Sequence, residues 1–250
     1  MPELAQTGSG IELQYCATTR RIRCGALVLA MLPAACSSGP PPISYDRGAD
    51  HVTVITLLEP AGGTKPILRS AAPVSPLGMF GVIGALGDLQ IQSSHEDHYA
   101  ALLENRQFSP RSLLIADVTR VLAAEGYSEK YVEVARPDLD FLTQYPSDAA
   151  TASDAYLDIV LMSYGYFALT GLDPYEPVVH VTFRLIRPND SKALMQGSFV
   201  YSGYDKGATR PDPAFDYLHY TDFDADVDRS IKGIEQGLSE AADAIGKALN

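Results

Sequence analysis

Three apolar, β-branched runs in the C-terminal half of the sequence constrain the fold most strongly. Residues 156–169, YLDIVLMSYGYFAL, are typical of one long strand, with a bend expected at Gly165. Residues 178–186 and 193–201 alternate apolar and polar side chains on either side of the turn sequence PNDS at 188–191. The runs therefore predict three strands, of which the last two form a β-hairpin.

Helices are predicted before and after these strands. Ser109 followed by Pro110 is a typical helix start, and Gly126 is a typical helix end. A shorter helix is expected over residues 96–105. The last helix is predicted to begin at Asp224 or Asp226, because apolar residues then recur along one face almost to the C-terminus.

The remaining segments complete the expected order of elements. Residues 51–58 and 130–135 are predicted strands, whereas residues 59–76, 136–152 and 206–213 are expected to be loops. The order of strand, helices, strands, hairpin and helix predicts an α/β or α+β fold. We expect a single domain with a mixed sheet, helices packed against it and a C-terminal amphipathic helix.

The first 36 residues have the pattern of an export signal. Arg20, Arg21 and Arg23 precede a short apolar stretch, and small residues lead to Cys36. Such a stretch is too short to span a membrane and is typical of a secretory signal. The cysteine makes it resemble the lipobox of bacterial lipoproteins. That resemblance implies cleavage before Cys36, acylation of Cys36 with fatty acids such as palmitate and, with Ser37 next, sorting to the outer membrane.

Cysteine and charge counts agree with this interpretation. Cleavage removes two of the three cysteines and leaves Cys36, so we expect no intramolecular disulfide in the mature chain. The formal net charge of −12 argues against a nucleic-acid partner and against electrostatic attraction to anionic membranes. We therefore expect the acyl chains to provide membrane attachment. Residues 1–35 are predicted to be an N-terminal extension and signal peptide, residues 36–50 a lipidated tether, and residues 51–250 a periplasmic domain.

The predicted domain also resembles a group of envelope lipoproteins. The resemblance rests on DAYLDIVLMSYGYF, on VVHVTFRLIRPNDSKALMQGSFVYSG, on the closing helix and on the Gly126-Tyr127 pair after a helix. Members of the group include the curli secretion lipoprotein, the penicillin-binding-protein activator lipoproteins and the N-terminal domain of the TolB protein. The resemblance implies a non-enzymatic adaptor or assembly role and identifies no functional residue.

Residues 77–89, LGMFGVIGALGDL, depart from that group because glycine recurs at every third position between residues 78 and 87. The segment is too short to span a bilayer as a helix. Glycine at this spacing permits close backbone approach, so one interpretation is an element that docks on a membrane or a protein. The other interpretation, which we favour, is a buried helix or an apolar loop of the domain.

Two polar motifs were considered as metal sites. His95-Glu96-Asp97-His98 places two histidines three residues apart, whereas helical zinc motifs space them by four and need further ligands. We favour a solvated helix start. Asp222, Asp224, Asp226 and Asp228 alternate as at the start of a calcium loop, but the required glycine and glutamate are absent. We favour an acidic cap of the last helix.

No enzyme signature is present in the sequence. There is no GxSxG motif, and the Asp138 and Asp140 pair lies in a predicted loop where solvation is the usual state. His180 lies in a predicted strand and is interpreted as a packed histidine. We predict no catalytic residue, no cofactor and no metal, and name Cys36 as the only site residue, for lipidation.

Eight of the fourteen tyrosines lie between residues 156 and 220, and this concentration favours an interaction role. Packing on the sheet would account for about half of them. The expected function is that of an outer-membrane-anchored lipoprotein facing the periplasm, which binds or assembles with an envelope protein. The alternative is an auxiliary component of an envelope transport or secretion complex. A hydrolase of envelope material is a third class with no motif in its support.

Overall fold

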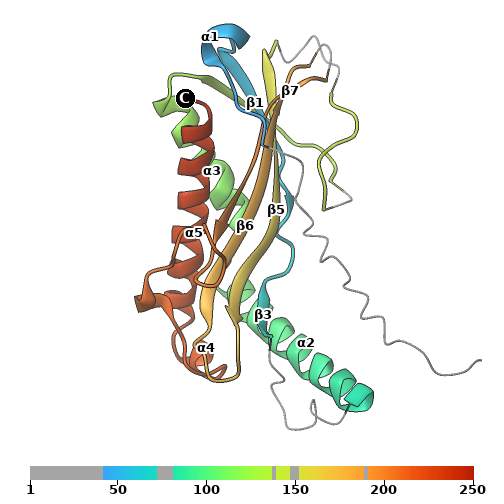
Figure 1. Ribbon diagram of the computed structural model, residues 1–250, viewed down its shortest axis with the longest axis vertical. Helices are drawn as coiled ribbons and strands as arrows, with labels where there is room; N and C mark the ends of the chain where they lie inside the picture. Colours follow the sequence, from blue (N-terminus) through green and yellow to red (C-terminus); the bar gives the residue numbers. More distant parts are fainter. Residues whose placement is uncertain (1–41, 72–80, 137–138, 147–151, 189–190) are drawn as a thin grey trace, which may run out of the picture. The chain divides into compact units, whose positions relative to one another are not determined.

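A seven-stranded sheet forms the centre of the computed structural model, with strand order β4-β1-β5-β6-β7 and with β2 and β3 pairing with β5 (Figure 1). The structure describes residues 42–71, 81–136, 139–146, 152–188 and 191–250, of which 81–87 are described by their backbone alone. The strands are β1 (Val54–Leu58), β2 (Ala61–Gly62), β3 (Ile67–Ser70), β4 (Ser128–Val132), β5 (Ala155–Ala168), β6 (Glu176–Ile186) and β7 (Ala193–Tyr201). The helices are α1 (Arg47–Asp50), α2 (Gly81–Asn105), α3 (Pro110–Ala124), the 3-10 turn η2 (Pro213–Phe215), α4 (Asp222–Ala225) and α5 (Val227–Ala248).

Strand β5 is the axis of the sheet. One of its edges pairs in parallel with β1, β2 and β3 in turn, and β1 also pairs in parallel with β4. Its other edge pairs antiparallel with β6, which pairs antiparallel with β7. The predicted mixed sheet, long strand and hairpin are therefore confirmed. A register shift between Leu161 and Ser163 marks a bulge in β5, and Gly165, where the sequence predicts a bend, has a φ of 132° where β3 passes close to it.

Helices α3 and α5 cover one face of this sheet (Figure 1). The α5 stripe that faces the core is fully buried at Ile234, Leu238, Ala241 and Ile245. A Cβ atom at Gly237 would lie 2.7 Å from side-chain atoms of Tyr201 and Val179, so glycine allows α5 to approach β6 and β7 closely. The predicted amphipathic C-terminal helix is thus the main cover of the core.

The predicted ends of α3 and the predicted start of the last helix agree with the structure. The Ser109 hydroxyl accepts a hydrogen bond from the Ser112 N–H at 3.3 Å, and Pro110 is the first residue of α3. Gly126, just after α3, has a φ of +81°, a conformation that favours glycine. Asp226 caps α5 by accepting a hydrogen bond from the Arg229 N–H at 3.2 Å. The acidic-cap interpretation is confirmed for Asp226.

The segment predicted as a loop over residues 59–76 contains two strands, so that prediction was wrong. Strand β2 has two residues and β3 has four, which is too few to show a clear alternation in the sequence. Both exist because they pair with β5. Strand β4 begins two residues before the predicted run at 130–135.

Helix α2 begins at Gly81, fifteen residues earlier than the helix expected at 96–105. The glycine-rich segment 77–89 therefore continues into α2, while residues 77–80 lie outside the described residues. Asp88 is buried and Leu89 is 62% exposed. None of the helices in the described ranges is both long enough and apolar enough to cross a membrane.

Contacts of the domain begin before the expected boundary at residue 51. Ile43 pairs with Gln196 of β7 through two backbone hydrogen bonds of 3.1 Å. Arg47 of α1 donates to the Glu125 carbonyl at 2.8 Å and lies 4.5 Å above the Tyr127 ring. The described part of the segment expected to be a tether is thus attached to the domain.

Candidate functional site

An apolar hollow of about 520 Å³ lies on the sheet face opposite α3 and α5. Val178, Val179 and His180 of β6 are all in its lining, and Val179 also belongs to the core, where its side chain lies against Gly237 of α5. Because side chains alternate along a strand, the Val178 and His180 side chains point away from the helices, on the opposite side of β6 from Val179. The hollow is therefore a feature of the sheet face that α3 and α5 leave uncovered.

The strand register explains how the lining residues meet. Ser163 of β5 lies opposite His180 of β6, and His180 lies opposite Val200 of β7. Phe167 and Leu169 extend the apolar lining along β5. The hollow thus contains the row of Ser163, His180 and Val200 bordered by larger apolar side chains, and its volume is within the usual range of small-molecule pockets.

His180 is the titratable group on the floor of this hollow. Burial lowers its pKa below the ordinary histidine value, and the nearby Asp205 carboxylate opposes that effect only in part. The imidazole is therefore neutral at neutral pH and offers one donor and one acceptor nitrogen. This makes the floor polar without making it charged.

The loop after β7 forms one side of the hollow. The Tyr204 hydroxyl donates a hydrogen bond to the Pro174 carbonyl at 2.8 Å, and its ring meets Phe167 edge to face at 5.7 Å. Burial raises the pKa of Tyr204, so its hydroxyl stays protonated. Asp205 follows it on the rim. The arrangement offers shape, an apolar surface and one carboxylate.

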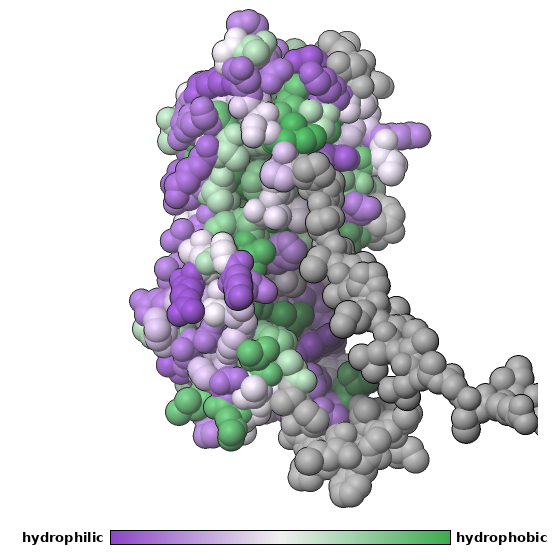
Figure 2. Space-filling view, viewed as in Figure 1, coloured by the Kyte–Doolittle hydropathy of each residue, from purple (hydrophilic) through white to green (hydrophobic). Residues whose placement is uncertain are grey.

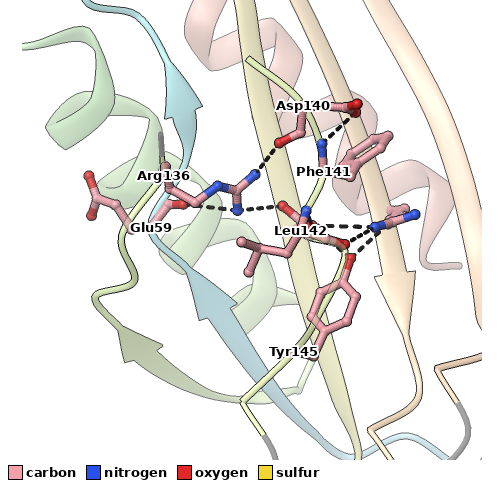
Figure 3. Close-up of polar contacts among 8 residues, drawn as sticks. Glu59, Arg136, Asp140, Phe141, Leu142 and Tyr145 are labelled. Atoms are coloured by element: carbon pink, nitrogen blue, oxygen red, sulfur yellow. Dashed lines mark hydrogen bonds and ion pairs between the residues drawn. The ribbon is translucent and has the colours of Figure 1, made fainter. Parts of the chain in front are cut away.

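A buried polar cluster occupies the same sheet face nearer the start of β5 (Figure 3). Asp158 is fully buried and accepts three hydrogen bonds, at 2.7 Å from Arg136, 2.9 Å from the Leu142 N–H and 2.7 Å from the Tyr145 hydroxyl. Arg136, whose side chain is 2% exposed, also donates to the Asp140 carbonyl at 2.8 Å. Asp158 therefore holds the loop containing residues 139–146 against the sheet.

A second arginine completes this cluster. Arg184 of β6 donates to the Tyr145 hydroxyl at 2.8 Å and to the Leu142 carbonyl at 2.7 Å. Its guanidinium lies 4.5 Å above the Phe141 ring and 3.8 Å from Asp158. Burial and the Asp158 carboxylate raise the pKa of Tyr145, so its hydroxyl remains a donor. Every charge is paired, and the cluster fixes a loop.

The structure brings together the histidine motif at residues 95–98 and the aspartate motif at residues 222–228, the two motifs that the sequence singled out. His98 Nε2 lies 2.6 Å from Asp224 Oδ1, and Arg106 donates to Asp228 at 2.8 Å. These contacts fasten α2 to α4 and α5. Within the described residues, no three His, Cys, Asp or Glu side chains converge as metal ligands would.

The other members of these motifs have structural partners. The His95 ring stacks on Tyr220 with 3.6 Å between centroids, and its burial lowers its pKa. Glu96 was expected in a solvated helix start, but it is 2% exposed and pairs with Arg69 and Lys65. That expectation was wrong for Glu96, because β3 runs beside α2 and supplies the arginine.

Several predicted residues fall elsewhere. Cys36 and Asp138 lie outside the described residues. Asp140 is exposed, and its carboxylate accepts a hydrogen bond from the Phe141 N–H. Five of the eight C-terminal tyrosines are buried in the packing of the sheet rather than available to a partner: Tyr156, Tyr164, Tyr166, Tyr201 and Tyr217.

Sequence reasoning missed the Asp158 cluster and the hollow. A single aspartate within the apolar run AYLDIVL was the available signal for the cluster, since a buried carboxylate needs partners. The hollow had no comparable signal. Its position depends on which sheet face the helices and the 139–146 loop leave uncovered.

The similarities between this chain and known proteins are similarities of structure. No protein-family model matches the sequence, and no curated protein matches it. Among solved structures, a PelC dodecamer from Paraburkholderia phytofirmans is similar at a TM-score of 0.37 and 11% identity, over 84% of this chain and 96% of that chain. Protein XCC0632 from Xanthomonas campestris has a TM-score of 0.41 and 10% identity, over 79% and 84% of the two chains.

Lipoprotein GNA1162 from Neisseria meningitidis is also similar, at a TM-score of 0.22 and 14% identity, over 59% of this chain and 81% of that chain. Likenesses at such low identities and TM-scores establish neither a family nor a function. The α+β class of the chain rests on its own mixed sheet and helices.

Proposed function

We propose that this protein is a lipid-anchored factor of the bacterial outer membrane whose periplasmic domain binds or assembles with an envelope protein and catalyses no reaction. The observation that carries the binding role is the apolar hollow on the uncovered sheet face. A pocket with an apolar lining and a few polar groups is the usual form of a binding site. Ser163 and Asp205 lie near His180 in this lining, but among the described residues no hydrogen bond joins either of them to His180.

The lipid anchor is the part of this proposal that rests on the sequence. Only six residue steps separate Cys36 from Pro42, where the described chain begins, so even a fully extended chain spans roughly 20 Å there. An acyl group on Cys36 would hold the start of the domain within that distance of the membrane. The domain would then meet partners at or near the membrane surface.

The buried cluster supports a binding role over a catalytic one. Asp158 and Arg136 are both removed from solvent, and each is satisfied by partners on the loop or the sheet. A group that must exchange protons with a substrate needs access to it. The cluster instead keeps the loop in place beside the hollow.

The proposal is tested by crosslinking and affinity capture of the lipidated protein from intact envelopes, with Cys36→Ala as the control. We expect a defined envelope protein that is captured with the native protein and is lost or strongly reduced in the control. Equal capture with both proteins would contradict the need for the anchor. Absence of any partner above background would contradict the binding role.

The alternative is an auxiliary component of an envelope transport or secretion complex. The observation in its favour is the 62% exposure of Leu89 near the start of α2, beside the glycine-rich segment. Leu89→Asp tests it, because an exposed apolar contact would be lost while the fold remains. Loss of complex association at unchanged thermal stability favours the transport role, and unchanged association counts against it.

A further inference from the structure

The surface around the hollow combines exposed leucines with carboxylates. Leu169, which lines the hollow, is 50% exposed, and Leu172 in the turn that follows is 97% exposed. Leu218 in a neighbouring loop is 70% exposed, and that loop is joined to the same turn by two hydrogen bonds between Tyr175 and Tyr217. Hydrophobic residues are visible on the surface at this end of the domain in Figure 2. The apolar surface therefore continues beyond the hollow.

Four carboxylates border this apolar surface, at Asp173, Glu176, Asp205 and Asp216. Asp205 lines the hollow, and the other three interact electrostatically with Tyr204, which also lines it. Within the described residues none of the four forms an ion pair, although Arg210 and Arg229 lie near enough to offset part of their charge. The border therefore has an excess of negative charge.

These carboxylates also disfavour one another. Burial raises the pKa of Glu176, and the charges of Asp216 and Asp173 raise it further. Burial likewise raises the pKa of Asp216, one of whose oxygens is buried without a hydrogen-bond partner in the described chain. A cation brought to this border would relieve the repulsion, whereas a further anion would increase it.

We infer that the hollow receives an apolar side chain of a partner protein segment that carries arginine or lysine beside it. The apolar side chain enters between Phe167, Val178 and Val200, and the cationic group meets the acidic border. This rests on the proposed binding function and names the chemistry of its partner. A second copy of the chain is disfavoured because it would bring the same acidic border, and anionic lipid is disfavoured for the same reason.

Two amidated tetrapeptides provide the probe, one with leucine and phenylalanine between arginines and one with the same pair between glutamates. Binding is measured by isothermal titration calorimetry to the lipidated protein in nanodiscs of neutral lipid. We expect the arginine peptide to bind about tenfold more tightly, with affinity that falls as salt is added. Equal affinities for the two peptides would overturn the inference.

Variants locate the binding. Val200→Trp fills the hollow and is expected to lower the affinity for the arginine peptide about tenfold, while Ser128→Trp at the opposite sheet edge leaves it unchanged. Leu169→Ser, at a half-exposed position, is expected to lower the affinity for the arginine peptide severalfold. Unchanged affinity in both hollow variants would overturn the site.

Charge variants test the border. Asp205→Asn is expected to weaken binding of the arginine peptide about threefold, and Glu133→Gln, at an exposed position outside the border, to leave it unchanged. An equal effect of the two changes would contradict a local role. If a partner crosslinked in cells proves to contact the hollow through an acidic segment, this inference fails while the binding function stands.

Discussion

Removing the Asp158 carboxylate is the most demanding test of the cluster that fixes the 139–146 loop. In Asp158→Ala the Arg136 side chain, 2% exposed, loses its counter-charge, and Arg184 lies close enough to repel it. The Leu142 N–H and the Tyr145 hydroxyl also lose their acceptor. Breaking a buried ion pair from one side costs about 3–5 kcal/mol. We expect the free energy of unfolding to fall by that amount.

The measurement is urea unfolding followed by far-ultraviolet circular dichroism, because the chain has no tryptophan. Asp158→Asn keeps the shape and loses the charge, so we expect a smaller loss of about 2–3 kcal/mol. Asp140→Ala is the matched control. Among the described residues its exposed carboxylate accepts a hydrogen bond only from the adjacent Phe141 N–H, and we expect a loss of stability below about 1 kcal/mol.

A double variant separates the buried charge from the loop itself. Asp158→Leu with Arg136→Met removes both charges and is expected to recover stability to within about 1–2 kcal/mol of the native protein. The reasoning would be refuted if Asp158→Ala cost less than about 1 kcal/mol, or if the double variant were no more stable than Asp158→Ala. Faster hydrogen exchange at the Leu142 amide in Asp158→Ala would report the release of the loop directly.

Three further changes have defined outcomes. Gly237→Ala places a Cβ against Tyr201 and is expected to lower the free energy of unfolding by about 1–3 kcal/mol in urea titrations, a result that unchanged stability would contradict. The pKa of His95 is lowered in the fold, so near and below the ordinary histidine pKa of 6.5 the unfolded chain binds more protons than the folded one, and stability should fall as the pH falls through that region. His95→Gln should reduce this pH dependence in urea titrations at several pH values. An unchanged dependence of stability on pH would refute this role of His95. Cys36→Ala is expected to abolish incorporation of labelled palmitate, and retained label would place the acylation elsewhere.

The strands that carry the hollow were predictable because each is long enough to show its pattern. The predicted runs at 178–186 and 193–201 match the ends of β6 and β7 closely, since alternation and the turn between them act over short distances. Strands β2 and β3 were not predictable from their own residues, because their conformation depends on pairing with β5.

The candidate site was less accessible to sequence reasoning than the strands. Asp158 and Arg136 are 22 residues apart, and their meeting depends on a loop that crosses the sheet face. His180 was correctly placed in a strand, but the sequence does not indicate that its face is left uncovered. That depends on the packing of α3 and α5 on the other face, which joins residues distant in the chain.

Site-specific photocrosslinking in intact cells tests the central claim most directly. A photoreactive amino acid is placed at Val200 in the hollow and, as the control, at Ser128 on β4. The account predicts a defined envelope-protein adduct from position 200 that is absent from position 128 and is lost when Cys36→Ala is combined with it. No adduct from position 200, or equal adducts from both positions, would contradict a membrane-anchored protein that binds through this hollow.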